Sequence, residues 1–419
     1  MAELIDTGDL SEKVILAGIN TGDDEGFLIS MKELKELTEN TGAQVVGEMY
    51  WNHPAPANAT YLGKGKIEEL KALVEETGAT GIVCDSELTT AQLSNLSNEL
   101  DTKVMDRTLV ILDIFARRAT TSEGRVQVEL AQMRYRMTRL KGLGTSLSRL
   151  GGGIGTRGPG EKKLETDRRL MRERITALKR ELQEIERHRD TLRAQRQRNK
   201  VPVIAIVGYT NAGKSTLLNK LTNAGVLQED MLFATLDPVT REYILEDGQK
   251  VLFTDTVGFI RNLPHNLVEA FKSTLEEVLY ADIILTVADA SDPDMASQLS
   301  VVRETLGSLG VKDKYVITAF NKCDKAPEGW TLKDFSADDS VSISAATGEN
   351  LDLLLAKIRD GLSGRMILME RTFGYRDAGL IADIRKQGRL LTEEYRDDGI
   401  FVKAYVPGEL FSRINKILK

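Results

Sequence analysis

The sequence predicts an α/β protein with more than one domain. Its 419 residues exceed what a single hydrophobic core usually organises, so two to four domains are expected. Short apolar runs alternate with helical patterns near the N-terminus and again from residue 200, which is typical of sheets covered by helices. Between these regions the apolar spacing becomes purely helical. These observations predict domains at residues 1–115, 116–199, 200–363 and 364–419.

Composition narrows the class of protein. With 41% hydrophobic and 28% charged residues, the chain resembles an ordinary globular protein. It has no apolar run near the ~20 residues needed to span a bilayer and no basic, then apolar, leader, so we expect a cytoplasmic protein. Two cysteines and three histidines are too few for a disulfide framework or a Cys/His metal site. Cys84 and Cys323 are therefore expected to be packing residues.

Residues 1–115 are predicted to form a small parallel α/β domain. Strand-like runs begin at Val14, Ala43 and Gly81. Helices are expected to open at Ser30, to span residues 65–77 and to lie near residues 88–100. The sequence GKGK at residues 63–66 opens the second helix and could bind an anion, although a simple turn with a basic surface is favoured because no GK[ST] is present.

Two apolar stripes predict a pair of facing helices in residues 116–199. The first stripe has spacings of four and three residues, at Val126, Leu130, Met133, Met137 and Leu140. The second has a seven-residue repeat with two intervening positions filled, at Leu164, Met171, Ile175, Leu178, Leu182, Ile185 and Leu192. Because each stripe can bury the other, an α-helical hairpin is expected.

The connection between the stripes, residues 142–163, is rich in glycine and is predicted to be a non-helical tip. Residues 117–200 carry 23 Lys/Arg and 10 Asp/Glu, a net charge of +13, within a chain whose total is −7. A basic element on an acidic body suggests a polyanionic partner. The alternative interpretations are a solvated helical surface and a flexible linker. The tip's own cations are Arg149, Arg157, Lys162 and Lys163.

A phosphate-binding loop is predicted after residue 207. An apolar strand at residues 201–207 leads into the pattern GxxxxGK[ST], and a helical run follows. Backbone N–H groups and the positive helix end supply the donors that a polyphosphate needs. Lys214 is expected to reach the β and γ phosphates, and the Ser215 hydroxyl to bind Mg²⁺. The predicted loop residues are Gly208, Tyr209, Thr210, Asn211, Ala212, Gly213, Lys214 and Ser215.

A second motif, DTVG, follows the strand VLFT. Its acid meets the magnesium shell and its glycine N–H reaches the γ-phosphate in nucleotide-hydrolysing P-loop proteins. In this chain the four residues are Asp255, Thr256, Val257 and Gly258.

The base-recognition motif predicts guanine. A carboxylate at Asp324 can accept from both N1–H and the 2-amino group of guanine, whereas adenine would leave it unpaired. The preceding motif residues are Asn321, Lys322 and Cys323, and the backbone of Ser344, Ala345 and Ala346 could close over the base. The alternative for this last segment is a plain strand-to-helix turn. Residues 200–363 are therefore predicted to be a P-loop GTPase domain, a mixed sheet with flanking helices.

Hydrolysis in this domain is predicted to be slow. Phe259 follows Gly258, where Ras-like enzymes carry a glutamine that orients the attacking water, and it cannot hydrogen-bond. A rate of ~10⁻⁴ to 10⁻² s⁻¹ is expected for the unassisted reaction. Arg241 and Arg261 lie in or beside the switch segments. They either replace the missing glutamine in catalysis or are surface residues. Thr235 and Thr240 both have the chemistry to complete the magnesium shell.

Three segments, FATLDP, DTVGFI and GTRGPGEKKLETDRR, are similar to those of the HflX family of ribosome-associated GTPases, which is related to translation factors. YLGKGKIEEL and RRATTSEGRVQVELAQ resemble that family's N-terminal region. The resemblance implies an N-terminal α/β domain, a helical hairpin, the GTPase core and a small C-terminal α/β domain. It also favours Thr235 as the magnesium ligand, within a first switch formed by Phe233, Ala234, Thr235, Leu236 and Asp237.

The same resemblance implies a function. It implies a factor that binds the large ribosomal subunit and its RNA and that splits or rescues stalled or idle ribosomes. We expect the protein to be a monomer. GTP is the expected substrate, with Mg²⁺ held by Ser215, Thr235 and Asp255, and the residues expected to act in catalysis are Lys214, Thr235 and Gly258. The alternative is an ATP-driven RNA-remodelling enzyme, which would tolerate Asp324→Asn and respond to changes near Lys64. A membrane-remodelling GTPase lacks the expected amphipathic basic helix with aromatic anchors.

The last predicted domain starts near residue 364. From Met366 the sequence has a strand-like run, a helix near residues 377–386, the strand-like run GIFVKAYV and a closing helix. A compact α/β appendage is expected.

Overall fold

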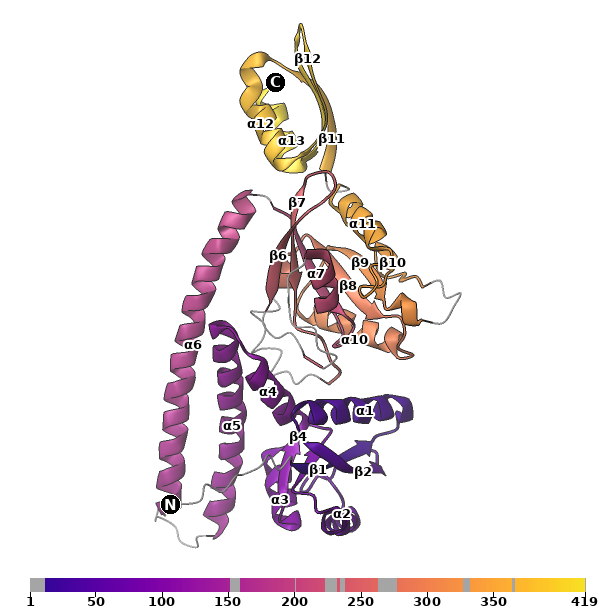
Figure 1. Ribbon diagram of the computed structural model, residues 1–419. Coiled ribbons are helices and arrows are strands. Elements are labelled where there is room, and N and C mark those ends of the chain that lie inside the picture. The colour runs from indigo at the N-terminus through magenta and orange to yellow at the C-terminus, as the bar shows by residue number, and fades with distance from the viewer. Residues whose placement is uncertain are drawn as a thin grey trace, which may run out of the picture. The chain divides into compact units, whose positions relative to one another are not determined.

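The computed structural model of the chain is shown in Figure 1, whose labels are used below. The first of two units holds the N-terminal elements through Ile185, and the second holds the strands from Val203 onward. The described residues are 12–150, 159–199, 201–222, 232–233, 238–262, 277–326, 332–363 and 366–418.

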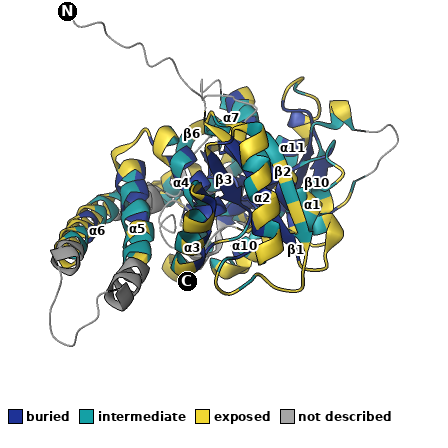
Figure 2. Cartoon of the chain, turned by 90° about the horizontal axis from the view of Figure 1, so that it is seen from below, coloured by how far each residue is buried: buried dark blue, intermediate teal, exposed yellow. Residues whose placement is uncertain are grey.

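A four-stranded parallel sheet of order β2-β1-β3-β4 forms the centre of the N-terminal region. Odd-numbered residues of β1 pack with α2 and α3, whereas a side chain at Gly18 would collide with Phe27 and Met31 of α1 on the opposite face. Figure 2 shows β3 fully buried while α2 carries exposed residues on its outer side. The strands are β1 (Lys13–Asn20), β2 (Gln44–Asn52), β3 (Gly81–Cys84) and β4 (Lys103–Asp106), and the helices are α1 (Asp24–Asn40), α2 (Lys64–Thr77), α3 (Thr90–Leu100) and α4 (Arg107–Arg118).

One expectation for this region was wrong, and one strand was missed. Helix α1 begins at Asp24, six residues before Ser30, because the Asp23 carboxylate caps the helix by accepting from the N–H of Gly26. Strand β4 has only four residues and was not predicted, since so short a run carries no readable alternation. At the sequence GKGK, Lys66 pairs with Glu69 (2.5 Å) and Lys64 is exposed.

Two long helices, α5 (Ser122–Leu150) and α6 (Pro159–Asn199), form the predicted hairpin. Their stripes face each other: Val126 and Leu130 pack with Ile175 and Leu178 in one cluster. The expectation that residues 142–163 are not helical was wrong for both ends. Helix α5 runs through Gly142 and Gly144, since a helix-interior glycine costs only ~1 kcal/mol, and Pro159 is a favourable first residue for α6. Residues 151–158, which include Arg157, lie outside the described residues.

The second sheet has six strands in the order β10-β9-β8-β5-β7-β6, parallel except for β6. The mixed sheet with flanking helices that the sequence predicts is confirmed. Apolar residues on its strands and on α7 and α11 form one buried core. The strands are β5 (Val203–Gly208), β6 (Val239–Ile244), β7 (Lys250–Asp255), β8 (Ile283–Asp289), β9 (Tyr315–Asn321) and β10 (Asp339–Ser342), and the helices are α7 (Lys214–Thr222), α10 (Met295–Ser308) and α11 (Leu351–Ser363).

The C-terminal region is an antiparallel sheet of order β11-β13-β12 covered by two helices, with a core of its own. Strand β12 was not predicted, because its sequence RLLTEEYR is largely polar. The elements are β11 (Met366–Phe373), α12 (Ala378–Gln387), β12 (Arg389–Arg396), β13 (Gly399–Pro407) and α13 (Gly408–Ile417).

Candidate nucleotide site

The phosphate loop connects the end of β5 to the start of α7, and two of its glycines are required by close contacts. Gly208 has φ +154° and Gly213 has φ +94°. A Cβ at Gly208 would collide with the carbonyl of Val287, and one at Gly213 with the side-chain amide of Asn321. The backbone of the loop therefore lies in direct contact with β8 and β9 at these two positions. Only glycine, which has no Cβ, permits so close an approach.

Lys214, the candidate phosphate-binding residue, and Ser215, the candidate magnesium ligand, are the first two residues of α7. Lys214 is 6% exposed and donates from Nζ to the carbonyl oxygen of Tyr209 at 2.7 Å. The Ser215 hydroxyl donates to Oδ2 of Asp255 at 2.7 Å. A hydroxyl beside a carboxylate is an oxygen donor set that suits Mg²⁺, whose remaining ligands are usually phosphate and water. Ala234, Thr235, Leu236 and Asp237 lie outside the described residues.

The DTVG segment is bonded directly to the phosphate loop. The N–H of Thr210 donates to the carbonyl of Phe259 at 2.8 Å, and the N–H of Phe259 donates to the carbonyl of Gly208 at 3.1 Å. Phe259 is 2% exposed, so its ring is packed in the protein and cannot orient water. Gly258, which precedes Phe259, therefore lies beside Thr210 of the loop. Motif spacing alone does not reveal these two backbone hydrogen bonds, because they join residues about fifty positions apart.

Asn321, at the end of β9, ties the base-recognition segments to the loop. Its Nδ2 donates to the carbonyl of Ala212 at 2.8 Å, and its Oδ1 accepts from the N–H of Ala345 at 2.9 Å. Ser344 and Ala345 are buried and Ala346 is exposed. Asp324 lies on a short 3₁₀ helix, Cys323–Lys325, with its side chain exposed, as guanine recognition would require.

Sequence reasoning missed Asp289 at the end of β8. Its Oδ2 accepts from Lys322 Nζ at 2.7 Å, and its Oδ1 accepts from the Ser291 hydroxyl at 2.6 Å. This ion pair fixes the lysine next to Asp324. The available signal was the run IILTVAD, an apolar strand ending in an acid beside β5.

Other candidates lie elsewhere. Thr240 is on β6, where its hydroxyl is 3.0 Å from that of Thr254, and the exposed Arg241 donates to the carbonyl of Thr240. Phe233 and Arg261 belong to the first unit; Phe233 is buried with its ring edge-on to Phe115, 4.7 Å between centroids. None of these contacts brings a polar group to the phosphate loop.

Burial lowers the pKa of Lys214 to about 8, opposed by the nearby Asp255 carboxylate, which raises it. An unfolded lysine titrates near 10.5, so this residue binds more protons in the unfolded chain between pH 8 and 10. The contribution of Lys214 to the stability of the nucleotide-free protein therefore becomes less unfavourable as pH rises through that window.

Nucleotide phosphates should restore the positive charge of Lys214. At pH 8 we therefore expect GTP binding to take up about half a proton, falling toward zero near pH 6.5. Calorimetry in two buffers with different heats of ionisation measures this number. Uptake that does not change between pH 6.5 and 8 would contradict a buried lysine with a lowered pKa.

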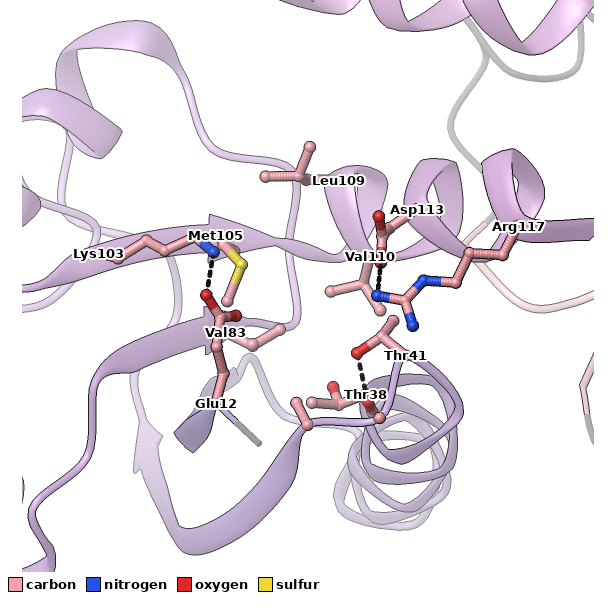
Figure 3. Close-up of a pocket in the computed structure, with 12 residues that line it drawn as sticks. Glu12, Thr38, Thr41, Val83, Lys103, Met105, Leu109, Val110, Asp113 and Arg117 are labelled. Carbon is pink, nitrogen blue, oxygen red and sulfur yellow. Dashed lines mark hydrogen bonds and ion pairs between the residues drawn. The ribbon is translucent and has the colours of Figure 1, made fainter. Parts of the chain in front are cut away.

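The N-terminal sheet carries a separate cavity of about 720 Å³ (Figure 3). Its charged side chains pair with one another: Glu12 with Lys103 at 2.6 Å, and Asp113 with Arg117 at 3.0 Å. No residue of the nucleotide motifs lines it. The cavity is therefore distinct from the nucleotide site.

Among the described residues there is neither a candidate membrane-spanning helix nor a candidate metal-binding cluster. In the described part of the chain, no helix combines the length and the apolar character that crossing a membrane requires. The same residues hold no group of three or more His, Cys, Asp or Glu that could bind a metal ion by themselves.

Comparisons with known proteins agree with this geometry. Three family models match the chain: "GTP-binding GTPase N-terminal" at residues 29–116, "GTP-binding GTPase Middle Region" at 118–196 and "50S ribosome-binding GTPase" at 203–322. The GTPase HflX of Lacrimispora saccharolytica is 59% identical over 99% of this chain and 98% of its own. That of Caldanaerobacter subterraneus is 46% identical over 98% and 94%.

Among solved structures, the crystal structure of the SsGBP and GDP complex is 26% identical, covering 83% of this chain and 98% of that one, with a TM-score of 0.47. The similarity to these two curated relatives, at 59% and 46% identity over nearly the whole of this chain, shows that the chain belongs to the HflX family of GTPases.

Proposed function

We propose that GTP binding controls association of this protein with the large ribosomal subunit, and that hydrolysis releases it. The family model that matches residues 203–322 is described as "50S ribosome-binding GTPase", which supports this partner. We further propose that the protein acts in the cytoplasm as a monomer and separates the subunits of stalled or idle ribosomes. In this scheme the triphosphate orders the switch segments, and its loss releases them.

Ser215 and Asp255 are proposed to hold Mg²⁺, together with Thr235. The ion would neutralise charge on the β and γ phosphates. Lys214 and the N–H of Gly258 bind the terminal phosphate, and Asn321 holds the loop in shape through Ala212. Asp324 recognises the guanine. Binding and charge stabilisation are thus assigned to the phosphate loop, the DTVG segment, the base-recognition segment and Thr235.

Ribosome docking is proposed to accelerate hydrolysis, because Phe259 leaves the water without the usual orienting side chain. Single-turnover rates with and without large subunits measure the effect. Equal rates would contradict it.

The observation that carries the ribosomal partner is the basic surface of the hairpin. Along α6, Arg169, Arg172, Lys179 and Arg180 are all exposed. Exposed cations along one helix can neutralise RNA phosphates. The hairpin as a whole is also basic, with a net charge of +13 over residues 117–200.

Sedimentation with purified large subunits tests the proposal. We expect the protein to co-sediment with a non-hydrolysable GTP analogue and to stay in the supernatant with GDP. The double variant Arg172→Glu with Arg180→Glu should weaken binding more than tenfold and flatten its dependence on salt. The matched control, Lys312→Glu with Arg376→Glu, makes the same charge change at two exposed residues outside the hairpin. Equal losses in both variants, or no binding with the analogue, would overturn the proposal.

Subunit separation is a finer claim with its own measurement. Light scattering of idle ribosomes should fall when the protein and GTP are added. Binding without a fall in scattering would leave a ribosome-binding GTPase that does not split ribosomes.

A further inference from the structure

A hydroxyl of the phosphate loop is buried without a hydrogen-bond partner. Thr210 is 5% exposed, and among the described residues its Oγ1 makes no hydrogen bond. A buried hydroxyl in this state is unfavourable, because it gives up water and gains nothing in return. Valine would fill the same space with no such cost. The hydroxyl therefore calls for a partner that arrives with the nucleotide.

Thr210 lies beside Gly258, one of the two residues expected to bind the terminal phosphate. A Cβ built on Gly258 would be 2.8 Å from the methyl carbon of Thr210 and 3.0 Å from Nζ of Lys214. The methyl group of Thr210 and the ammonium group of Lys214 therefore both lie beside Gly258. Lys214 and the N–H of Gly258 are the two groups that contact the γ-phosphate in this class of site. The backbone of Thr210 is held in place by its N–H bond to Phe259, at 2.8 Å.

Hydrolysis needs a polar group in this part of the site. Phe259 occupies the position at which other GTPases present a water-orienting amide, and its buried ring has no polar atom. A hydroxyl has one donor and two acceptor sites, so it can contact a phosphate oxygen and a water molecule at once. In the described residues of the phosphate loop, Thr210 Oγ1 is a buried side-chain oxygen without a hydrogen-bond partner.

We propose that Thr210 is a catalytic residue of GTP hydrolysis. Its hydroxyl donates to a γ-phosphate oxygen and accepts a hydrogen bond from the attacking water. The water oxygen forms a bond to the γ-phosphorus while the bond from that phosphorus to the β–γ bridging oxygen breaks. The water's proton passes to a phosphate oxygen, and the products are GDP and inorganic phosphate. This inference rests on GTP hydrolysis by the chain itself and does not require ribosome binding.

Single-turnover hydrolysis by the full chain, with protein in excess over GTP, tests the assignment. Thr210→Val removes the hydroxyl and keeps the shape, so we expect the rate to fall about tenfold or more, the effect of one lost hydrogen bond in the transition state. Thr210→Ser keeps the hydroxyl and should stay within a few-fold of the parent rate. GDP affinity should be unchanged in both variants, because GDP lacks the phosphate that the hydroxyl contacts.

Stability separates this role from a structural one. The melting temperature of nucleotide-free Thr210→Val should equal or exceed that of the parent, since the substitution removes an unmatched buried hydroxyl. Thr305→Val, on α10, is the matched control: its hydroxyl bonds a helix carbonyl at 2.8 Å, and hydrolysis should not change. The assignment is overturned if Thr210→Val hydrolyses GTP at the parent rate. It is also overturned if GDP affinity falls in parallel with the rate, which would indicate a distorted loop.

Discussion

Asp324→Asn is expected to lower GTP affinity by about a thousandfold, because an amide cannot accept from both donors of the guanine edge and places its own N–H₂ against them. Asp324 is exposed in the structure and ready to meet a base. The neighbouring Cys323 N–H bonds the carbonyl of Ile343 at 3.1 Å, so the segment that carries the carboxylate is fixed before nucleotide arrives. Isothermal calorimetry with GTP and GDP measures the loss.

The same variant should bind xanthosine triphosphate better than the parent does. Xanthine carries a carbonyl where guanine carries the 2-amino group, so the asparagine amide gains an acceptor. Asp352→Asn, at an exposed position in the first turn of α11, is the control and should leave GTP binding unchanged. A parent protein that binds ATP as tightly as GTP would refute the recognition scheme altogether.

The sequence allowed most of the nucleotide site to be predicted, because its motifs are contiguous. Gly208 through Ser215 form one loop whose chemistry requires fixed spacing, and the strand before it is uniformly apolar. The facing stripes of α5 and α6 were also predictable, since one face of a long helix repeats its apolar residues many times. Long, periodic signals thus determined the elements that were correct.

What could not be predicted depends on contacts between distant segments or on short elements. Two examples are the pairing of Tyr209 with Phe259 and the ion pair of Lys322 with Asp289. Each joins segments that are far apart in the sequence and become neighbours only in the folded sheet. The ends of α5 and α6 differed from expectation because glycine is a weak helix breaker when apolar residues continue on either side. The unmatched hydroxyl of Thr210 is invisible in a sequence, since burial and the lack of a partner are both properties of the fold.

Arg107→Met is expected to destabilise the N-terminal domain by about 3–5 kcal/mol, the usual effect of removing one partner from a buried ion cluster. Arg107 is 1% exposed, and its guanidinium pairs with Asp85 at 2.9 Å and also with Glu33. Two carboxylates would be left in a region that excludes water. Arg107→Lys should recover only part of the loss, because an ammonium cannot bond both acids in the fork geometry of arginine.

Trp51 packs against the N-terminal core and reports its unfolding once the second tryptophan, Trp330, is replaced by phenylalanine. Urea titrations followed by its fluorescence give the free energy of unfolding of this domain. Adding Glu33→Gln and Asp85→Asn to Arg107→Met should restore stability, because the stranded charges are then removed together. GTP affinity measured alongside verifies that the nucleotide site stays folded. A loss below about 1 kcal/mol for Arg107→Met alone would mean that water reaches the cluster and screens it. The cluster would then contribute little to holding α1 against the ends of β3 and β4.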